Sequence, residues 1–130
     1  MIKYLVVVLA VAGGFYAVSR HASLESGLQY VSQNKGAFWA PRASFTIGFI
    51  YYQREDYSKA KEVFTQLLTD YPTCQFAARG LFYLEDSAES IRDWDTAKAA
   101  ADRYIEEHPT GDRIELMRRR QQMLRYQHGP

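Results

Sequence analysis

The chain has 130 residues, of which 47% are hydrophobic and 24% are charged, and its formal net charge at pH 7 is +1. That length fits one small domain with a modest core, and the composition is typical of a globular protein and not of a disordered one. The near-neutral charge gives no general indication of a nucleic-acid binder. The single cysteine, Cys74, excludes an intramolecular disulfide, and we expect its thiol to be a small buried hydrophobic group.

Residues 1–21 form the most apolar segment of the chain. Lys3 precedes fifteen uncharged, mostly apolar residues, Tyr4 to Val18, and Arg20 follows them. Fifteen helical residues span about 22 Å, and the flanking residues bring the segment near the lower limit for crossing a hydrocarbon core of about 30 Å. We therefore expect a single-pass membrane anchor that leaves the rest of the chain outside the cytoplasm. A signal peptide cleaved near Ser19 and a buried core helix stay open as alternatives.

Residues 22–39 are expected to form a leading helix and a linker. Leu24, Leu28 and Val31 share one face of a helix from Ser23 to Ser32.

Two stretches that lie 37 residues apart resemble each other. Residues 56–72 read DYSKAKEVFTQLLTDYP and residues 93–109 read DWDTAKAAADRYIEEHP. Each begins with an aspartate suited to capping a helix and ends at a proline that stops the helix. A helix that begins at Pro41 and ends near Glu55 precedes the first stretch. Because each helix carries one apolar stripe, we expect antiparallel helical hairpins.

The first hairpin, residues 40–72, resembles a tetratricopeptide repeat. The resemblance rests on Ile47, Gly48, Tyr51, Ala60, Phe64, Leu67 and Pro72, with Ser44 in place of the usual large residue. The second hairpin, residues 73–109, is looser, since the pattern's glycine, tyrosine and phenylalanine are replaced by Glu85, Ala88 and Ala101. Its period is three residues longer than the usual one, and we expect its first helix to absorb them by running from about Thr73 to Ile91.

Elongated repeats of this form are similar to those of bacterial envelope proteins, such as the outer-membrane assembly lipoprotein and the Tol–Pal coordinator. Those lipoproteins need a cysteine after the signal segment, and this chain has none before Cys74. The resemblance therefore does not extend to lipid attachment.

Residues 110–130 are expected to cap the open end of the repeats. Asp112 and Glu115 have the spacing of a capping box, and the helix that follows places Ile114, Met117, Gln121 and Leu124 on one face. The predicted fold is all-α: an N-terminal apolar helix (transmembrane or signal), a short tetratricopeptide-like α–α solenoid of two hairpins, and a C-terminal capping helix.

The resemblance implies protein–protein interaction, through a groove lined by the first helix of each pair. Aromatic and arginine side chains are the usual anchors of such interfaces. The predicted partner-binding residues are Arg42, Phe45, Phe49, Tyr52, Arg79, Tyr83 and Asp86. As an alternative for Phe45 and Phe49, the Ser23–Ser32 helix covers them as ordinary core.

Four arginines near the C-terminus form a predicted basic docking surface: Arg118, Arg119, Arg120 and Arg125. They either make the solvated outer face of the capping helix or dock to anionic lipid or an acidic partner subunit. Nucleic-acid binding is not expected, because no aromatic stacking pattern accompanies the arginines.

Catalysis has little support in the sequence. The three histidines lie far apart, and His108 occupies the helix-stop position that Tyr71 holds in the first hairpin. No metal spacing, phosphate loop or nucleophile motif is present, and we expect the acidic pairs, including Glu85 with Asp86, at helix ends or on solvated faces. No cofactor, metal or small-molecule substrate is expected.

The predicted function is a non-enzymatic, membrane-anchored scaffold that serves as an accessory or assembly subunit of a cell-envelope membrane complex. The alternative is a soluble exported (periplasmic) adaptor after signal cleavage. An RNA-binding helical repeat would conflict with the apolar N-terminus.

Overall fold

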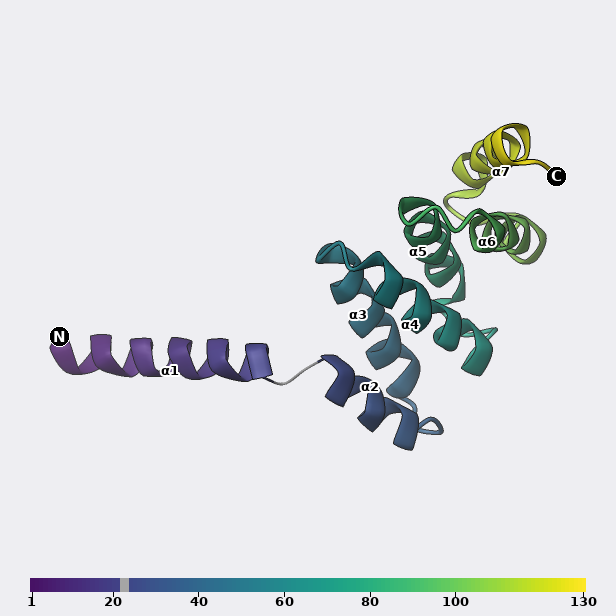
Figure 1. Cartoon of the computed structure of the whole chain (residues 1–130). Helices are drawn as coiled ribbons and strands as arrows, with labels where there is room; N and C mark the ends of the chain where they lie inside the picture. The colour runs from purple at the N-terminus through teal and green to yellow at the C-terminus, as the bar shows by residue number, and fades with distance from the viewer. Residues whose placement is uncertain (22–23) are drawn as a thin grey trace. The chain divides into compact units, whose positions relative to one another are not determined.

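The computed structural model describes the backbone of residues 1–21 and 24–130, and the side chains of residues 1–14 and 24–130. All regular structure in this part of the chain is helical, in seven helices labelled α1 to α7 (Figure 1). They divide between two units, Met1–Gln33 and Asn34–Pro130. The predicted all-α class is confirmed.

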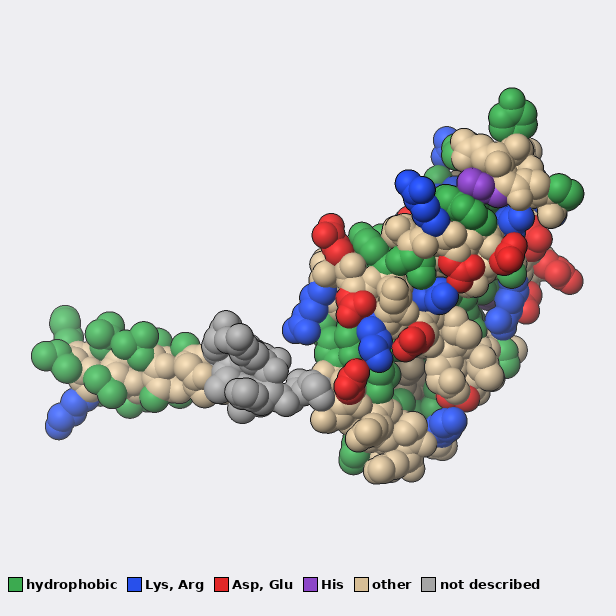
Figure 2. Space-filling view, viewed as in Figure 1, with side chains coloured by type: hydrophobic (Ala, Val, Ile, Leu, Met, Phe, Trp, Pro, Cys, Tyr) green, Lys and Arg blue, Asp and Glu red, His purple; other side chains and the backbone are tan. Residues whose placement is uncertain are grey.

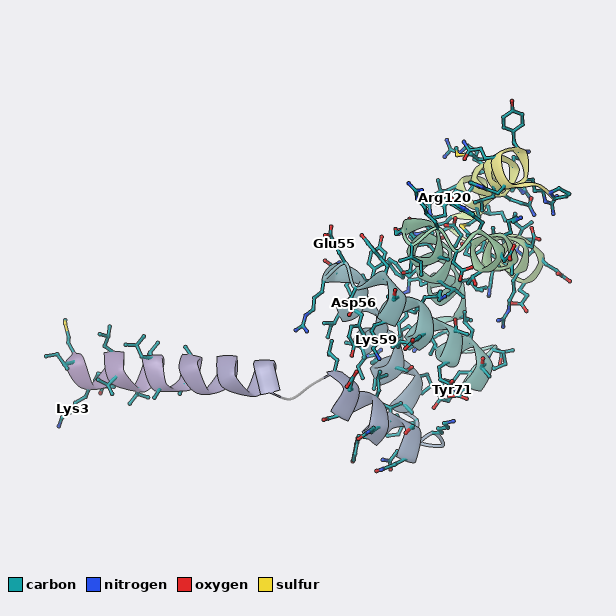
Figure 3. The ribbon with its side chains drawn as sticks, viewed as in Figure 1. Lys3, Glu55, Asp56, Lys59, Tyr71 and Arg120 are labelled. Carbon is teal, nitrogen blue, oxygen red and sulfur yellow. The ribbon has the colours of Figure 1, made fainter. Side chains whose placement is uncertain are left out.

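The first unit consists of α1 (Ile2–His21) and α2 (Leu24–Gln33). Side chains of residues 1–14 are exposed and mostly hydrophobic, with Lys3 at the N-terminal end (Figures 2 and 3). Over the described ranges, no helix is both long and apolar enough to cross a membrane. The expected membrane-spanning anchor therefore has no support from the described residues. The leading helix is confirmed from Leu24 onward, and Ser23 lies outside the described residues.

The second unit stacks antiparallel helix pairs. The first hairpin consists of α3 (Ala40–Gln53) and α4 (Tyr57–Asp70), the second of α5 (Ala77–Ser90) and α6 (Trp94–Glu107), and α7 (Ile114–His128) follows. Each helix from α3 to α6 packs against the next one along the chain (Figure 1). The α4 bounds agree with the sequence, because Asp56 caps its start and Pro72 follows its end.

The turns inside the two hairpins have the same geometry. Asp56 accepts a hydrogen bond on Oδ1 from the Lys59 N–H at 3.4 Å, and Asp93 accepts one from the Thr96 N–H at 3.3 Å (Figure 3 labels Asp56 and Lys59). The residue before each cap is left-handed, with φ of 61° at Glu55 and 60° at Arg92. The resemblance between residues 56–72 and 93–109 is therefore a structural repeat.

Asp93 has a second function in the fold. Its Oδ2 accepts a 2.8 Å hydrogen bond from Nζ of Lys61 on α4, which ties the turn of the second hairpin to the first. This interaction, with further hydrogen bonds from Thr96, lowers the pKa of Asp93 to about 2.

The predicted elongation of the second repeat's first helix is wrong, because α3 and α5 are both 14 residues long. The extra residues lie in the connection between α4 and α5. There, the Cys74 N–H donates to the Tyr71 carbonyl at 3.2 Å, and the Ala77 N–H donates to the Cys74 carbonyl at 3.0 Å. These local turns hold the chain out of a helix until Ala77.

The same pair of turns occurs before each of the helices α3, α5 and α7. The donor and acceptor positions are Asn34, Ala37 and Ala40, then Tyr71, Cys74 and Ala77, then His108, Gly111 and Ile114, each set 37 residues after the last. By this measure α7 corresponds to the first helix of a repeat.

Where the two helices of a hairpin cross, one contributes a small residue and the other a large one, and the two hairpins differ in which helix contributes which. A Cβ on Gly48 would meet the Phe64 ring at 2.9 Å, so α3 and α4 leave no room for a larger residue there. Thirty-seven residues on, Glu85 and Ala101 occupy the equivalent positions and are both fully buried. A large residue on α5 and a small one on α6 thus replace a small one on α3 and a large one on α4.

The α7 helix buries its predicted face, since Met117 and Leu124 are 0% and 2% exposed. The predicted capping box is wrong, because Arg113 is the N-cap residue and no side chain caps the helix.

The positions of α7 that are equivalent to the α6-facing side of α5 are polar. Leu81, Leu84 and Ala88 of α5 are buried, and Leu81 and Leu84 lie beside α6. The equivalent positions of α7 are Arg118, Gln121 and Arg125. Gln121 and Arg125 bond to Asp102 of α6, so α7 packs on the second hairpin through polar contacts as well as through Met117 and Leu124.

Candidate protein-binding face

The predicted partner-binding residues lie on α3 and α5, the first helices of the two hairpins. We call the side of these helices that carries them the first-helix face. Arg42 and Arg79 are exposed, Phe45 is buried, and the other members are half-buried. The half-buried members are Phe49, Tyr52, Tyr83 and Asp86.

Phe45 belongs to the core between the hairpins. Its ring centroid lies 5.1 Å from that of Phe76 and 5.8 Å from that of Phe64, and only 8% of the residue is exposed. Residues of the second unit thus surround this ring. Whether the Ser23–Ser32 segment covers Phe45 and Phe49 stays a prediction.

Tyr83 joins the aromatic residues of α3 to α5. Its ring centroid lies 4.8 Å from that of Tyr52 and 5.4 Å from that of Phe49. Aromatic pairs at these separations contribute more than their buried area alone. The middle of the first-helix face is therefore a row of packed rings with part of their surface open.

Tyr52 and Asp86 form a polar link between the same helices. The Tyr52 hydroxyl donates a hydrogen bond to Oδ2 of Asp86. Burial raises the pKa of Tyr52, and the bond to the Asp86 carboxylate raises it further. These two residues hold the hairpins together in addition to lying on the face.

Arg42 and Arg79 occupy equivalent positions, the third residue of α3 and of α5. The Arg79 guanidinium lies over the Phe45 ring at 4.9 Å from its centroid, and the Arg42 guanidinium lies over Phe76 at 5.9 Å. Among the described residues, neither arginine forms an ion pair. Stacking on a ring leaves the planar edge of a guanidinium open to carboxylate groups.

A buried ion pair next to this face was not predicted. Oε2 of Glu85 accepts a hydrogen bond from Nη1 of Arg120 at 2.6 Å, and the same nitrogen lies 3.2 Å from Oδ1 of Asp86 (Figure 3 labels Arg120). Glu85 is 0% exposed, so the expectation that it lies on a solvated face is wrong.

Burial raises the pKa of Glu85 to about 7, against the opposing effect of Arg120, and the neighbouring Glu89 adds to the rise. The other Glu85 oxygen, Oε1, is buried without a hydrogen-bond partner. The repeat alignment placed Glu85 at the helix crossing occupied by Gly48, but it gave no sign of the contact with Arg120.

The four arginines of the predicted docking surface do not share one environment. Arg120 is engaged by Glu85 and Asp86, and its guanidinium also lies 5.1 Å from the Phe82 ring centroid. Arg118 pairs with Glu115 at 3.3 Å and Arg125 with Asp102 at 3.3 Å, both near the surface. Arg119 is exposed. The structure therefore gives Arg120 an internal contact, whereas the other three stay at the surface.

Three carboxylates, those of Glu85, Asp86 and Glu89, have oxygens within 4.8 Å of one another. Such a group could hold a cation, but Arg120 already supplies a positive charge to it. We therefore assign no metal to these residues.

His108 and Cys74, which were considered for catalysis, lie at a helix end and in a turn. His108 ends α6 with φ −130° and ψ 56°, close to the −135° and 62° of Tyr71 at the end of α4, which confirms their equivalence. Its ring centroid lies 5.6 Å from that of Tyr104. Cys74 is half-buried in the turn before α5, less buried than expected.

Stacked antiparallel helix pairs with equivalent turns define a helical-repeat architecture. Within it, residues 42–73 match the family model of the tetratricopeptide repeat. The chain thus contains such a repeat, at the hairpin where the sequence resemblance was found, and no enzyme family is matched. No curated protein is significantly similar to the chain.

Proposed function

We propose that this chain is a non-catalytic scaffold that binds a protein partner through the first-helix face of α3 and α5. A tetratricopeptide repeat implies protein–protein interaction. The observation that carries the proposal is the pair of exposed arginines, Arg42 and Arg79, beside the half-buried Phe49 and Tyr83. Arginine and aromatic side chains are the residues that dominate binding energy in protein interfaces.

Photo-crosslinking in the source cells tests the binding face. A photoreactive phenylalanine analogue replaces Phe49, and in a matched control it replaces Thr65, an exposed residue of α4. We expect a discrete crosslinked protein from position 49 and none from position 65. Equal crosslinking from both positions, or none from position 49, would contradict the proposal.

Substituting the exposed arginines separates binding from folding. We expect Arg42→Ala combined with Arg79→Ala to weaken the crosslink strongly while the melting temperature changes by only a few degrees, because both side chains are exposed. Arg103→Ala on α6 is the matched control, since its pair with Glu107 lies at the surface.

We further propose that the chain works outside the cytoplasm as an accessory or assembly subunit of an envelope complex. The charged start, the apolar centre and the small residues near Ser19 support an export function for the N-terminal segment. The mass of the mature protein separates a retained segment from a cleaved one. Cell fractionation that recovers the full-length chain only from the cytoplasm would contradict this placement.

A further inference from the structure

Charge is divided along the first-helix face. Arg42 and Arg79 lie in the first turn of α3 and of α5, whereas Asp86 and Glu89 lie in the second half of α5. One end of the face is therefore basic and the other is acidic. This division follows the helix axes and does not depend on the chain's near-zero net charge.

The basic end combines three favourable features for an anionic group. Arg42 and Arg79 are exposed, and among the described residues neither has a carboxylate partner. Both stand at the N-terminal turn of a helix, where the helix dipole favours negative charge. Neither helix has a side-chain cap on its first N–H groups.

At the acidic end, carboxylates outnumber cations. Glu85, Asp86 and Glu89 lie within 4.8 Å of one another, and Arg120 is the cation that pairs with two of them. Oε1 of Glu85, in a residue that is 0% exposed, has no partner. The buried Oε1 is out of a partner's reach, but Asp86 and Glu89 are half-buried, and three carboxylates beside one guanidinium leave residual negative charge that suits a basic side chain.

Between the two ends lie the part-open rings of Phe49 and Tyr83. Seven residues separate Arg79 from Asp86 and ten separate it from Glu89, so the charged ends are about 10 to 15 Å apart along α5. This separation and the intervening rings define the length and the polarity of a complementary ligand.

We propose that the partner presents a short segment with one carboxylate and one basic side chain about 10 to 15 Å apart, separated by apolar residues. The carboxylate binds Arg42 and Arg79, and the basic side chain binds Asp86 and Glu89. A uniformly acidic segment or a nucleic acid would place negative charge against the acidic end, and a uniformly basic segment would meet the arginines. This inference rests on the proposed use of the first-helix face.

Three end-capped peptides test the charge pattern on the full chain by fluorescence polarisation. The zwitterionic probe reads Glu-Leu-Tyr-Leu-Lys, and its relatives carry Glu at both ends or Lys at both ends. In an extended strand the terminal side chains stand about 13 Å apart. We expect the zwitterionic probe to bind at least tenfold more tightly than either relative. Equal affinities for the three probes would overturn the proposal.

Charge reversal in the protein gives a result that loss of folding cannot imitate. Arg42→Glu combined with Arg79→Glu should shift the preference to the probe with two lysines, and Glu89→Lys should shift it to the probe with two glutamates. Arg103→Glu and Glu106→Lys on α6 are the matched controls and should leave the preference unchanged. An unchanged preference in the two face variants would reject the assignment.

Two further outcomes are distinguishable. If the probes fail to discriminate while position 49 still crosslinks to a protein, the proposed function stands and this inference fails. If analytical ultracentrifugation finds a dimer that Arg42→Glu or Glu89→Lys dissociates, the ligand of the face is a second copy of the chain, and the inferred partner segment is rejected.

Discussion

Replacing Glu85 by Gln isolates the effect of one buried charge. The substitution keeps the size of the side chain and a hydrogen-bonding oxygen for Arg120, but it removes the titratable group. Glu85 is 0% exposed and its pKa in the folded chain is about 7, whereas its ordinary value is 4.5. The folded protein therefore binds a proton at Glu85 at pH values where the unfolded chain does not.

The sign and size of the effect follow from linkage. Because the folded pKa is raised, Glu85 stabilises the fold below pH 4.5, and this stabilisation is lost as the pH rises to 7. The shift from 4.5 to about 7 corresponds to about 3 kcal/mol in the free energy of unfolding. Glu85→Gln should lack this loss. The free energy of unfolding of the variant should therefore rise by about 3 kcal/mol relative to that of the original chain as the pH increases from 4.5 to 7.

Urea unfolding followed by circular dichroism, at half-unit steps from pH 4.5 to 8, measures the difference. Glu106→Gln is the matched control, because Glu106 is exposed on α6, and it should change little at any pH. If Glu85→Gln and the original chain keep a constant difference over this range, the carboxylate is ionised throughout and the argument from burial is refuted.

Four smaller changes test the packing and the turns. Gly48→Ala should cost about 1 to 3 kcal/mol, because its Cβ would press on the Phe64 ring at 2.9 Å; thermal unfolding measures the loss. Asp56→Ala should lower the free energy of unfolding by about 1 kcal/mol, because a helix cap is lost. Asp93→Ala should lower it by more. The loss in Asp93→Ala should be smallest toward pH 2, because protonation of Asp93 at low pH removes the stabilisation that its lowered pKa provides. Glu55→Gly should stabilise the chain by about 0.5 kcal/mol, since φ is 61° there and glycine adopts that conformation without strain.

Each of these changes has a control or a contradicting result. Gly36→Ala should be tolerated, because nothing lies within 4 Å of its added Cβ, and an equal loss at Gly36 and Gly48 would contradict the packing argument. Equal losses in the two aspartate variants would mean that the Lys61 pair contributes nothing. A destabilised Glu55→Gly would mean that this side chain has a contact that outweighs the backbone strain.

Local signals predicted most of the helical arrangement. The Asp56 cap, the stripe on residues 57–70 and Pro72 gave the bounds of α4, because each acts within a few residues of the helix. The length of α5 was missed for a related reason. Three extra residues can lengthen either a helix or a turn. The hydrogen-bonded turns at Cys74 and Ala77 show that here they lengthen the connection between α4 and α5.

The site was less accessible to sequence reasoning than the fold. Arg42 and Arg79 were placed on the correct helices because the family pattern assigns their positions. The ion pair of Glu85 with Arg120 joins residues that are 35 apart, and no periodicity within one helix reveals it. Glu85 and Ala101 were each seen as departures from the pattern, but their meaning depends on packing against a helix in the same hairpin.

The opposite size choices at the two helix crossings also govern which helices recognise each other during folding. If α3 paired with α6 in the hairpin manner, Gly48 would face Ala101 and leave a cavity. If α5 paired with α4 in that manner, the carboxylate of Glu85 would meet the Phe64 ring. Both exchanged pairings are disfavoured, so each first helix selects its own second helix. The same mismatch would oppose the mispairing of α3 with α6, or of α5 with α4, between two copies of the chain, since misassembly is a known failure of repeat proteins.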